Sequence, residues 1–217
     1  MTENIATTKP VHDVLRAAVE ACEMGINRFT RFKADAMTHI DVAIAADNKY
    51  VLAKLVKAWM LLGGRDAIYR EAVDGLIADI EQCFAGQVSA GKRERGLLEA
   101  LKLSHAGQGI EAVTVLETLL DQAPCDLLVH QIIHEELFWL GRADWMRAIT
   151  ERASPAWDKD SADYGPFLSL RAFASEEAGD LDAAERFGRT AVEIDPTDIW
   201  GTHAVAHVHI SRVGSSA

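Results

Sequence analysis

Residues 179–196 read GDLDAAERFGRTAVEIDP, and this stretch decides the fold class. A weaker copy, GQGIEAVTVLETLLDQAP, occupies residues 107–124, so that glycine, alanine and proline recur 72 residues apart. Glycine ends a helix, alanine lets two helices approach closely, and proline follows a helix that cannot easily continue. The matched residues are Gly107, Ala112 and Pro124 in one copy and Gly179, Ala184 and Pro196 in the other, and the match extends seven residues upstream to Ala100 and Ala172. The two copies predict helical hairpins that repeat along the chain.

Apolar residues recur at helical spacing almost everywhere, and no stretch alternates between apolar and polar residues, so we expect an all-α chain. Glycines at the expected helix ends lie 34 to 44 residues apart, which leaves room for two helices in each interval. They are Gly25, Gly63, Gly107, Gly141, Gly179 and Gly214. This spacing predicts five hairpins followed by one terminal helix. In the longer loop at 154–166, we expect Trp157 and Asp158 to fix the loop onto the helices.

The composition is that of an ordinary globular protein, with 49% hydrophobic and 25% charged residues. The 217 residues carry a net charge of -11, which argues against binding to nucleic acid or to an anionic membrane surface. We expect a disordered N-terminus over residues 1–10 and a single repeat domain over residues 11–217. The three cysteines are far apart and the first residues form no apolar signal segment, which indicates a cytoplasmic protein.

Four longer stretches of the sequence indicate a particular family of repeat proteins. They are LLVHQIIHEELFWLGR (127–142), SPAWD (154–158), YGPFLSLRAFASEEAGDLDAAE (164–185) and IDPTDIWGTHAVAHV (194–208). Together they resemble the tetratricopeptide repeat protein 38 family, with a good match from Lys92 to Val208. The resemblance implies a right-handed α-solenoid of tetratricopeptide-like hairpins without an established reaction. Relatives usually continue beyond the HAVAHV string, so the resemblance implies a truncated member.

Two histidine pairs have the spacing of one helix face: His130 with His134, and His203 with His207. Histidines four residues apart can ligate a metal, so either pair is a candidate for metal binding or catalysis. Both pairs precede a turn glycine by 11 and 7 residues, which are positions inside a hairpin. We therefore expect buried imidazoles that bond to carbonyl or carboxylate groups, and we expect no cofactor.

Counting from the same glycines also gives the concave face of the solenoid, which is formed by the first helix of each hairpin. The predicted partner-binding residues are Gln131, Glu135, Phe138, Trp139, Phe173, Glu176 and Glu177. Aromatic rings beside carboxylates suit an extended peptide or a small molecule with a cationic group. The alternative is that the aromatic rings belong to the core and that the glutamates form a solvated face.

The sequence contains no glycine-rich phosphate loop, nucleophile elbow or Cys/His nucleophile spacing. We therefore expect a non-enzymatic scaffold that binds a basic or apolar protein segment, or a small ligand, in its groove. The alternative is a metal-binding accessory protein or helical-repeat enzyme that uses a histidine pair. The final helix, expected near 198–212, carries apolar residues all round, which predicts a homodimer or another partner at this helix.

Overall fold

The computed structural model describes residues 16–85 and 91–214, and these residues form eleven α-helices, two short 3-10 helices and no β-strand. The predicted all-α class is confirmed. The expected disordered segment at 1–10 lies outside the described residues. By their contacts the helices fall into two compact units. Unit 1 contains α1 to α6, and unit 2 contains α7 to α11 together with Thr30–Phe32.

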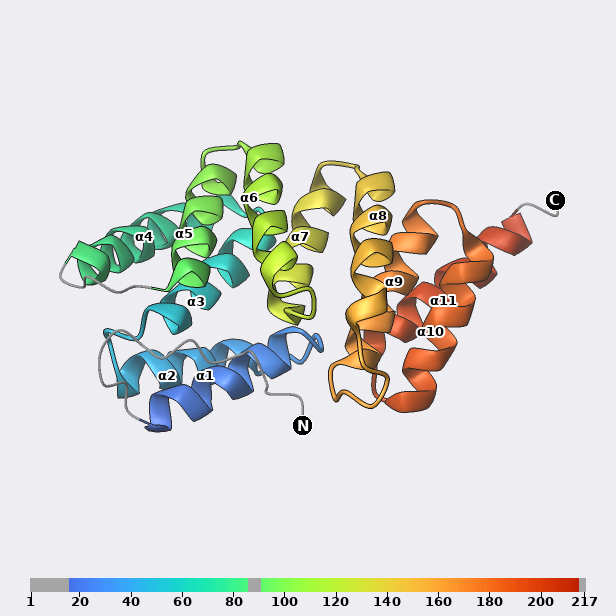
Figure 1. Ribbon diagram of the computed structural model, residues 1–217, viewed down its shortest axis with the longest axis horizontal. Coiled ribbons are helices and arrows are strands. Elements are labelled where there is room, and N and C mark those ends of the chain that lie inside the picture. Colours follow the sequence, from blue (N-terminus) through green and yellow to red (C-terminus); the bar gives the residue numbers. More distant parts are fainter. Residues whose placement is uncertain (1–15, 86–90, 215–217) are drawn as a thin grey trace. The chain divides into compact units, whose positions relative to one another are not determined.

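Unit 1 consists of three pairs of helices that are consecutive in the chain, and the two helices of each pair pack on one another (Figure 1). The first pair is α1 (Arg16–Phe29) with α2 (Ala36–Ala46), and the second is α3 (Val51–Gly63) with α4 (Arg70–Ala85), joined through the 3-10 helix η1 (Ala67–Tyr69). The third pair is α5 (Lys92–His105) with α6 (Gly109–Gln122).

Unit 2 contains two further pairs and a last helix. The pairs are α7 (Leu127–Trp139) with α8 (Ala143–Ala153), and α9 (Tyr164–Glu177) with α10 (Leu181–Ile194). The 3-10 helix η2 (Ser154–Ala156) follows α8, and α11 (Ile199–Gly214) packs against both α9 and α10. Helices α7 and α9 are buried on almost every side, which is the pattern of central helices.

Three hairpin turns share one hydrogen-bonded geometry at the predicted glycines. Gly107, Gly141 and Gly179 all have positive φ, between 66° and 82°, which favours glycine. At Gly179, its own N–H donates to the carbonyl of Glu176 and the N–H of Asp180 donates to the carbonyl of Ser175. The other two glycines have the same pair of bonds, which satisfy the last carbonyls of the preceding helix. The repeat found in the sequence is therefore present in the backbone at these three turns.

The predicted turn at Gly25 is wrong. Gly25 lies inside α1 and is buried, and a Cβ added there would come within 2.5 Å of the Ile40 side chain on α2. This glycine allows two helices to approach closely, so it does not end a helix. The turn follows Phe29 instead. Gly63 and Gly214 are the last residues of α3 and α11, as expected, although the left-handed residue after α3 is Arg65.

The close-approach positions agree with the predicted register. All four repeat alanines, Ala100, Ala112, Ala172 and Ala184, are completely buried. In the loop after α8, Trp157 is buried with Phe167 in one apolar cluster, and the two rings stack 4.3 Å apart. The prediction that this loop is held onto the helices is confirmed for Trp157. It is wrong for Asp158, which is exposed and whose carboxylate accepts a hydrogen bond from the N–H of Asp160 within the loop.

The last helix exposes only part of its apolar surface, which corrects the expectation of apolar residues exposed all round. Ala204 and Val208 are completely buried, because α11 packs against α9 and α10. Ile199, Ile210 and Val213 are exposed. A homodimer through α11 stays a prediction. Among the described helices, none is long and apolar enough to cross a membrane.

Candidate functional site

Five of the seven predicted partner-binding residues lie near the C-terminal ends of two helices of unit 2. Phe138 and Trp139 are in the last turn of α7, and Phe173, Glu176 and Glu177 are in the last turns of α9. A glycine turn of the shared geometry follows each helix directly, at Gly141 and Gly179. The turns therefore fix the helix ends that carry these side chains.

The aromatic side chains of the two helices are in contact. The Phe138 ring centroid lies 5.6 Å from that of Phe173 and 5.5 Å from that of Trp139, and Phe173 lies 4.9 Å from Trp200 on α11. Phe173 is buried, whereas Phe138 is 45% exposed and Trp139 is 53% exposed. We call Phe138, Trp139, Phe173 and Trp200 the aromatic patch. Within this patch, the ring of Phe173 belongs to the core, whereas the rings of Phe138 and Trp139 face solvent.

Gln131 and Glu135 have different environments. Gln131 is buried, and its side-chain amide donates to Glu135 with an N···O distance of 2.9 Å. Glu135 is partly exposed. The hydrogen bond from Gln131 therefore orients the Glu135 carboxylate. Gln131 is not part of the exposed surface, which corrects its predicted role as a partner-binding residue.

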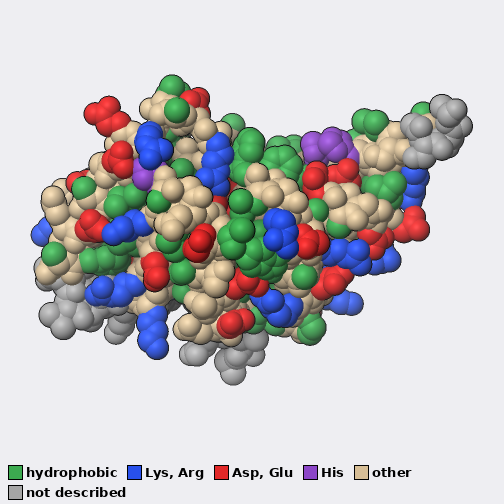
Figure 2. Space-filling view, turned by 90° about the horizontal axis from the view of Figure 1, so that it is seen from above, with side chains coloured by type: hydrophobic (Ala, Val, Ile, Leu, Met, Phe, Trp, Pro, Cys, Tyr) green, Lys and Arg blue, Asp and Glu red, His purple; other side chains and the backbone are tan. Residues whose placement is uncertain are grey.

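A histidine–glutamate cluster adjoins the aromatic patch. The His203 ring stacks on Trp200, with centroids 5.0 Å apart, and it lies 4.1 Å from the His207 ring. Nδ1 of His207 is 3.5 Å from Oε1 of Glu176 on α9. Figure 2 shows one such grouping, in which histidine side chains are bordered by acidic and hydrophobic ones at the top of the view, right of centre. The contacts place Glu176 and the aromatic patch on one continuous surface.

The cluster changes the protonation of its members. Burial raises the pKa of Glu177, and the neighbouring carboxyl group of Glu176 raises it further. Burial also lowers the pKa of His203, and the nearby His207 imidazole adds to this effect. Both shifts disfavour the charged form of the group. At this surface the glutamate is therefore harder to ionise, and the histidine harder to protonate, than in water.

His130 and His134 have a different environment, inside unit 2. Both are buried; Nε2 of His130 lies 2.9 Å from the carbonyl oxygen of Pro124, and Nδ1 of His134 lies 2.8 Å from that of His130. Burial lowers the pKa of His130 to about 4 and that of His134 to about 3, so both rings are neutral near pH 7. The expectation of buried, carbonyl-bonded imidazoles is confirmed for this pair.

The same expectation of burial is wrong for the second pair: His203 is only partly buried, and the side chain of His207 is 45% exposed. As for metal binding by either pair, residues 16–85 and 91–214 contain no group of three or more histidine, cysteine, aspartate or glutamate side chains arranged to hold a metal ion. His203, His207 and Glu176 lie close together, with Nδ1 of His207 3.5 Å from Oε1 of Glu176 and the two imidazole centroids 4.1 Å apart.

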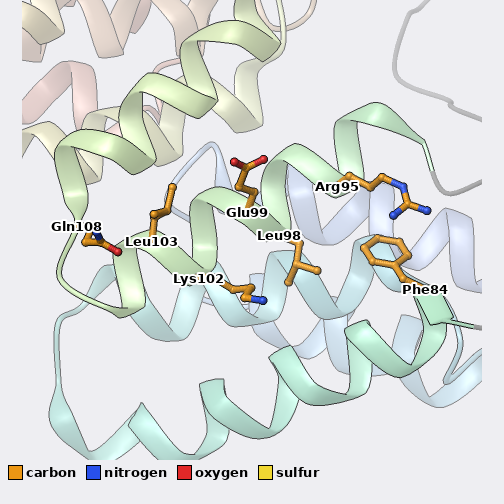
Figure 3. A pocket seen from close by; sticks show the side chains of 7 residues that line it. All are labelled: Phe84, Arg95, Leu98, Glu99, Lys102, Leu103 and Gln108. Atoms are coloured by element: carbon orange, nitrogen blue, oxygen red, sulfur yellow. The ribbon is translucent and has the colours of Figure 1, made fainter.

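Unit 1 contains a separate hollow of about 500 Å³ between α4 and α5, shown in Figure 3. Its two cations already have partners within the unit. The guanidinium group of Arg95 lies over the Phe84 ring at 5.1 Å, and Nζ of Lys102 is 2.5 Å from Oε1 of Glu81. The lining residues are Phe84, Arg95, Leu98, Glu99, Lys102, Leu103 and Gln108. The mixed charges do not define a ligand.

Sequence reasoning missed Trp200 and the contact between α11 and Glu176. The signal was present, because Trp200, His203 and His207 are spaced three and four residues apart and so share one helix face. Phe173, Glu176 and Glu177 have a similar spacing on α9. What the sequence does not show is that these two faces meet. No protein-family model matches the chain.

Proposed function

We propose that this protein is a non-enzymatic, helical-repeat interaction module, and that the surface formed by α7, α9 and α11 binds a protein segment. The observation that carries the proposal is the exposure of Phe138 and Trp139 above the buried ring of Phe173. Exposed aromatic side chains on a fixed base are the residues that contribute most to binding at protein interfaces. Contact with a partner would remove their apolar surface from water.

The hairpins support the further proposal of a tetratricopeptide-like solenoid. Consecutive helices pair in both units, and three turns repeat the same glycine geometry. In such a solenoid the first helix of each hairpin contributes to the concave face, and α7 and α9 are first helices. Membership of the tetratricopeptide repeat protein 38 family is part of this proposal, and the strings quoted above support it.

A selection from a random peptide library displayed on phage tests the proposed binding surface. We expect the purified wild-type protein to enrich particular peptides from the library. The double variant Phe138→Ala with Trp139→Ala should no longer enrich them. Both side chains are about half exposed, so the variant should fold normally. The matched control is Ile68→Ala with Ile110→Ala, which removes two exposed apolar side chains from unit 1. Equal enrichment by the two double variants would contradict the proposal.

A further inference from the structure

Among the described residues, Glu176 and Glu177 lack the arginine partner that several other acidic side chains of unit 2 have, such as Asp144, Glu151 and Asp163. On α10, Glu185 pairs with both Arg189 and Arg212, and these two arginines lower its pKa. Within the described residues, by contrast, neither Glu176 nor Glu177 pairs with a lysine or arginine, and the partner of Glu176 is His207. The cluster therefore contains two neighbouring carboxyl groups without a permanent cation between them.

One oxygen of this pair is both buried and unsatisfied. Oε2 of Glu176 accepts no hydrogen bond from the described residues, although the side chain is only 12% exposed. A buried acceptor without a donor costs free energy, and a buried carboxylate costs more than a neutral group. An incoming N–H donor with a positive charge would satisfy this oxygen and reduce the repulsion between the two carboxyl groups.

The aromatic patch places apolar surface directly beside these carboxyl groups. Phe173 is three residues before Glu176 on the same helix, so the two side chains share one face of α9. Phe138 contacts Phe173, and Trp139 contacts Phe138. A ligand bound at Glu176 and Glu177 would therefore extend across exposed aromatic rings. Aromatic faces attract cations as well as apolar groups, and nearby carboxylates strengthen that preference.

From this arrangement we infer that the occupant of the surface is a protein segment in which a basic side chain, arginine or lysine, is flanked by apolar side chains. The inference rests on the proposed function. The guanidinium or ammonium group binds at Glu176 and Glu177, and the apolar side chains pack on Phe138 and Trp139. A segment with acidic side chains would be repelled. A purely apolar segment would bring no positive charge to the two neighbouring carboxyl groups.

Two synthetic peptides test the inference. Both are acetylated, amidated and alternate leucine with a second residue, which is arginine in one and citrulline in the other. Citrulline has nearly the shape of arginine but no charge. Isothermal titration calorimetry at low salt should show the arginine peptide binding at least about tenfold more tightly, as expected for charge-assisted bonds at a partly buried carboxylate. The difference should shrink at higher salt.

Protein variants locate the effect. The double variant Glu176→Gln with Glu177→Gln should bind the two peptides equally, because it keeps the side-chain shapes and removes the charge. The control Asp121→Asn with Glu193→Gln removes the same charge from exposed positions near the ends of α6 and α10, and it should keep the preference for arginine. Thermal melting followed by circular dichroism confirms that both variants are folded.

The outcomes separate this inference from the proposed function. A preference for arginine that is lost only in the Glu176→Gln with Glu177→Gln variant supports both. Equal binding of the two peptides that is lost in Phe138→Ala with Trp139→Ala overturns the inference and leaves the proposed function standing. A preference for arginine that persists in the Glu176→Gln with Glu177→Gln variant places the cation elsewhere and overturns the inference.

Discussion

The two histidine pairs have the same spacing in the sequence and opposite environments in the structure. His130 and His134 on α7 are buried and bond to carbonyl groups. His203 and His207 on α11 lie at a partly exposed surface, against Trp200 and Glu176. Both pairs precede a glycine by the same two intervals, so the position within the repeat does not decide whether a histidine is buried.

The covering side chains make the difference. His130 lies against Phe167 and Trp157, with ring centroids 5.4 and 6.1 Å away, and Trp157 comes from the loop after α8. That loop is an insertion relative to the shorter hairpin turns. At α11, the neighbouring groups are a tryptophan of the same helix and a glutamate of α9. Histidines with the same four-residue spacing are therefore buried on α7, where the loop after α8 covers them. They are partly exposed on α11, where a carboxylate lies beside them.

Removal of the covering tryptophan should have the largest effect on stability. We expect Trp157→Ala to lower the free energy of unfolding by about 3–5 kcal/mol, because it leaves a cavity beside Phe167 and His130. Trp139→Ala removes the same side chain from a half-exposed position and should cost about 1 kcal/mol or less. Urea denaturation measures both. Equal losses would show that Trp157 does not cover the histidine pair.

The buried pair should make stability depend on pH. Below pH 6.5 the unfolded chain binds protons at His130 and His134, whereas the folded chain stays neutral there until about pH 4 and about pH 3. The free energy of unfolding should therefore fall as the pH falls from 6.5 to 4, by up to about 1.4 kcal/mol per pH unit for each histidine.

The variant His134→Asn isolates this dependence, since the asparagine amide can replace the Nδ1 donor toward the carbonyl of His130. Its unfolding free energy should vary less with pH between 6.5 and 4 than that of the wild type. If His134→Asn had an unchanged slope, the buried histidine would not be the group that titrates.

Ala172 tests the equivalence of positions between repeats. It precedes its turn glycine by seven residues, as His134 does on α7 and His207 does on α11. Because Ala172 is completely buried, Ala172→Leu should overpack the core and cost roughly 1 to 3 kcal/mol. Ala206→Leu, at an exposed position on α11, is the control and should change the denaturation midpoint little. An unchanged midpoint for Ala172→Leu would contradict the assigned repeat register.

The smallest expected effect concerns zinc. Since the described part of the chain has no arranged group of three metal ligands, zinc should shift the thermal midpoint by less than about 1 °C. A clear rise that disappears in His207→Asn would identify the exposed pair as a metal site and would favour the metal-binding alternative.

Local patterns predicted much of the fold. The glycines at 107, 141 and 179, the buried alanines and the covering Trp157 all follow from short-range chemistry, namely left-handed turns, close helix contacts and one large apolar side chain in a loop. Gly25 was misassigned because a glycine that ends a helix and a glycine at a helix crossing look alike in one sequence. Only the partner helix, which places Ile40 against it, distinguishes them.

The candidate site was predictable in part. Counting from the turn glycines found Phe138, Trp139 and Phe173, because their positions depend on one helix each. The contact between His207 and Glu176 depends on how α11 packs against α9, which is a tertiary arrangement that helical spacing alone does not determine. For the same reason, the spacing could not distinguish the buried histidine pair from the exposed one.

The most direct test of the proposed binding surface uses the indole N–H signals of the five tryptophans in a two-dimensional NMR spectrum. Trp139 and Trp200 belong to the aromatic patch, whereas Trp59 is buried in unit 1. Each signal can be assigned by a Trp→Phe variant, and the alternating leucine–arginine peptide is then added in steps. We predict that the signals of Trp139 and Trp200 shift in proportion to occupancy while that of Trp59 stays in place. Shifts at Trp59 with none at Trp139 or Trp200 would contradict the account.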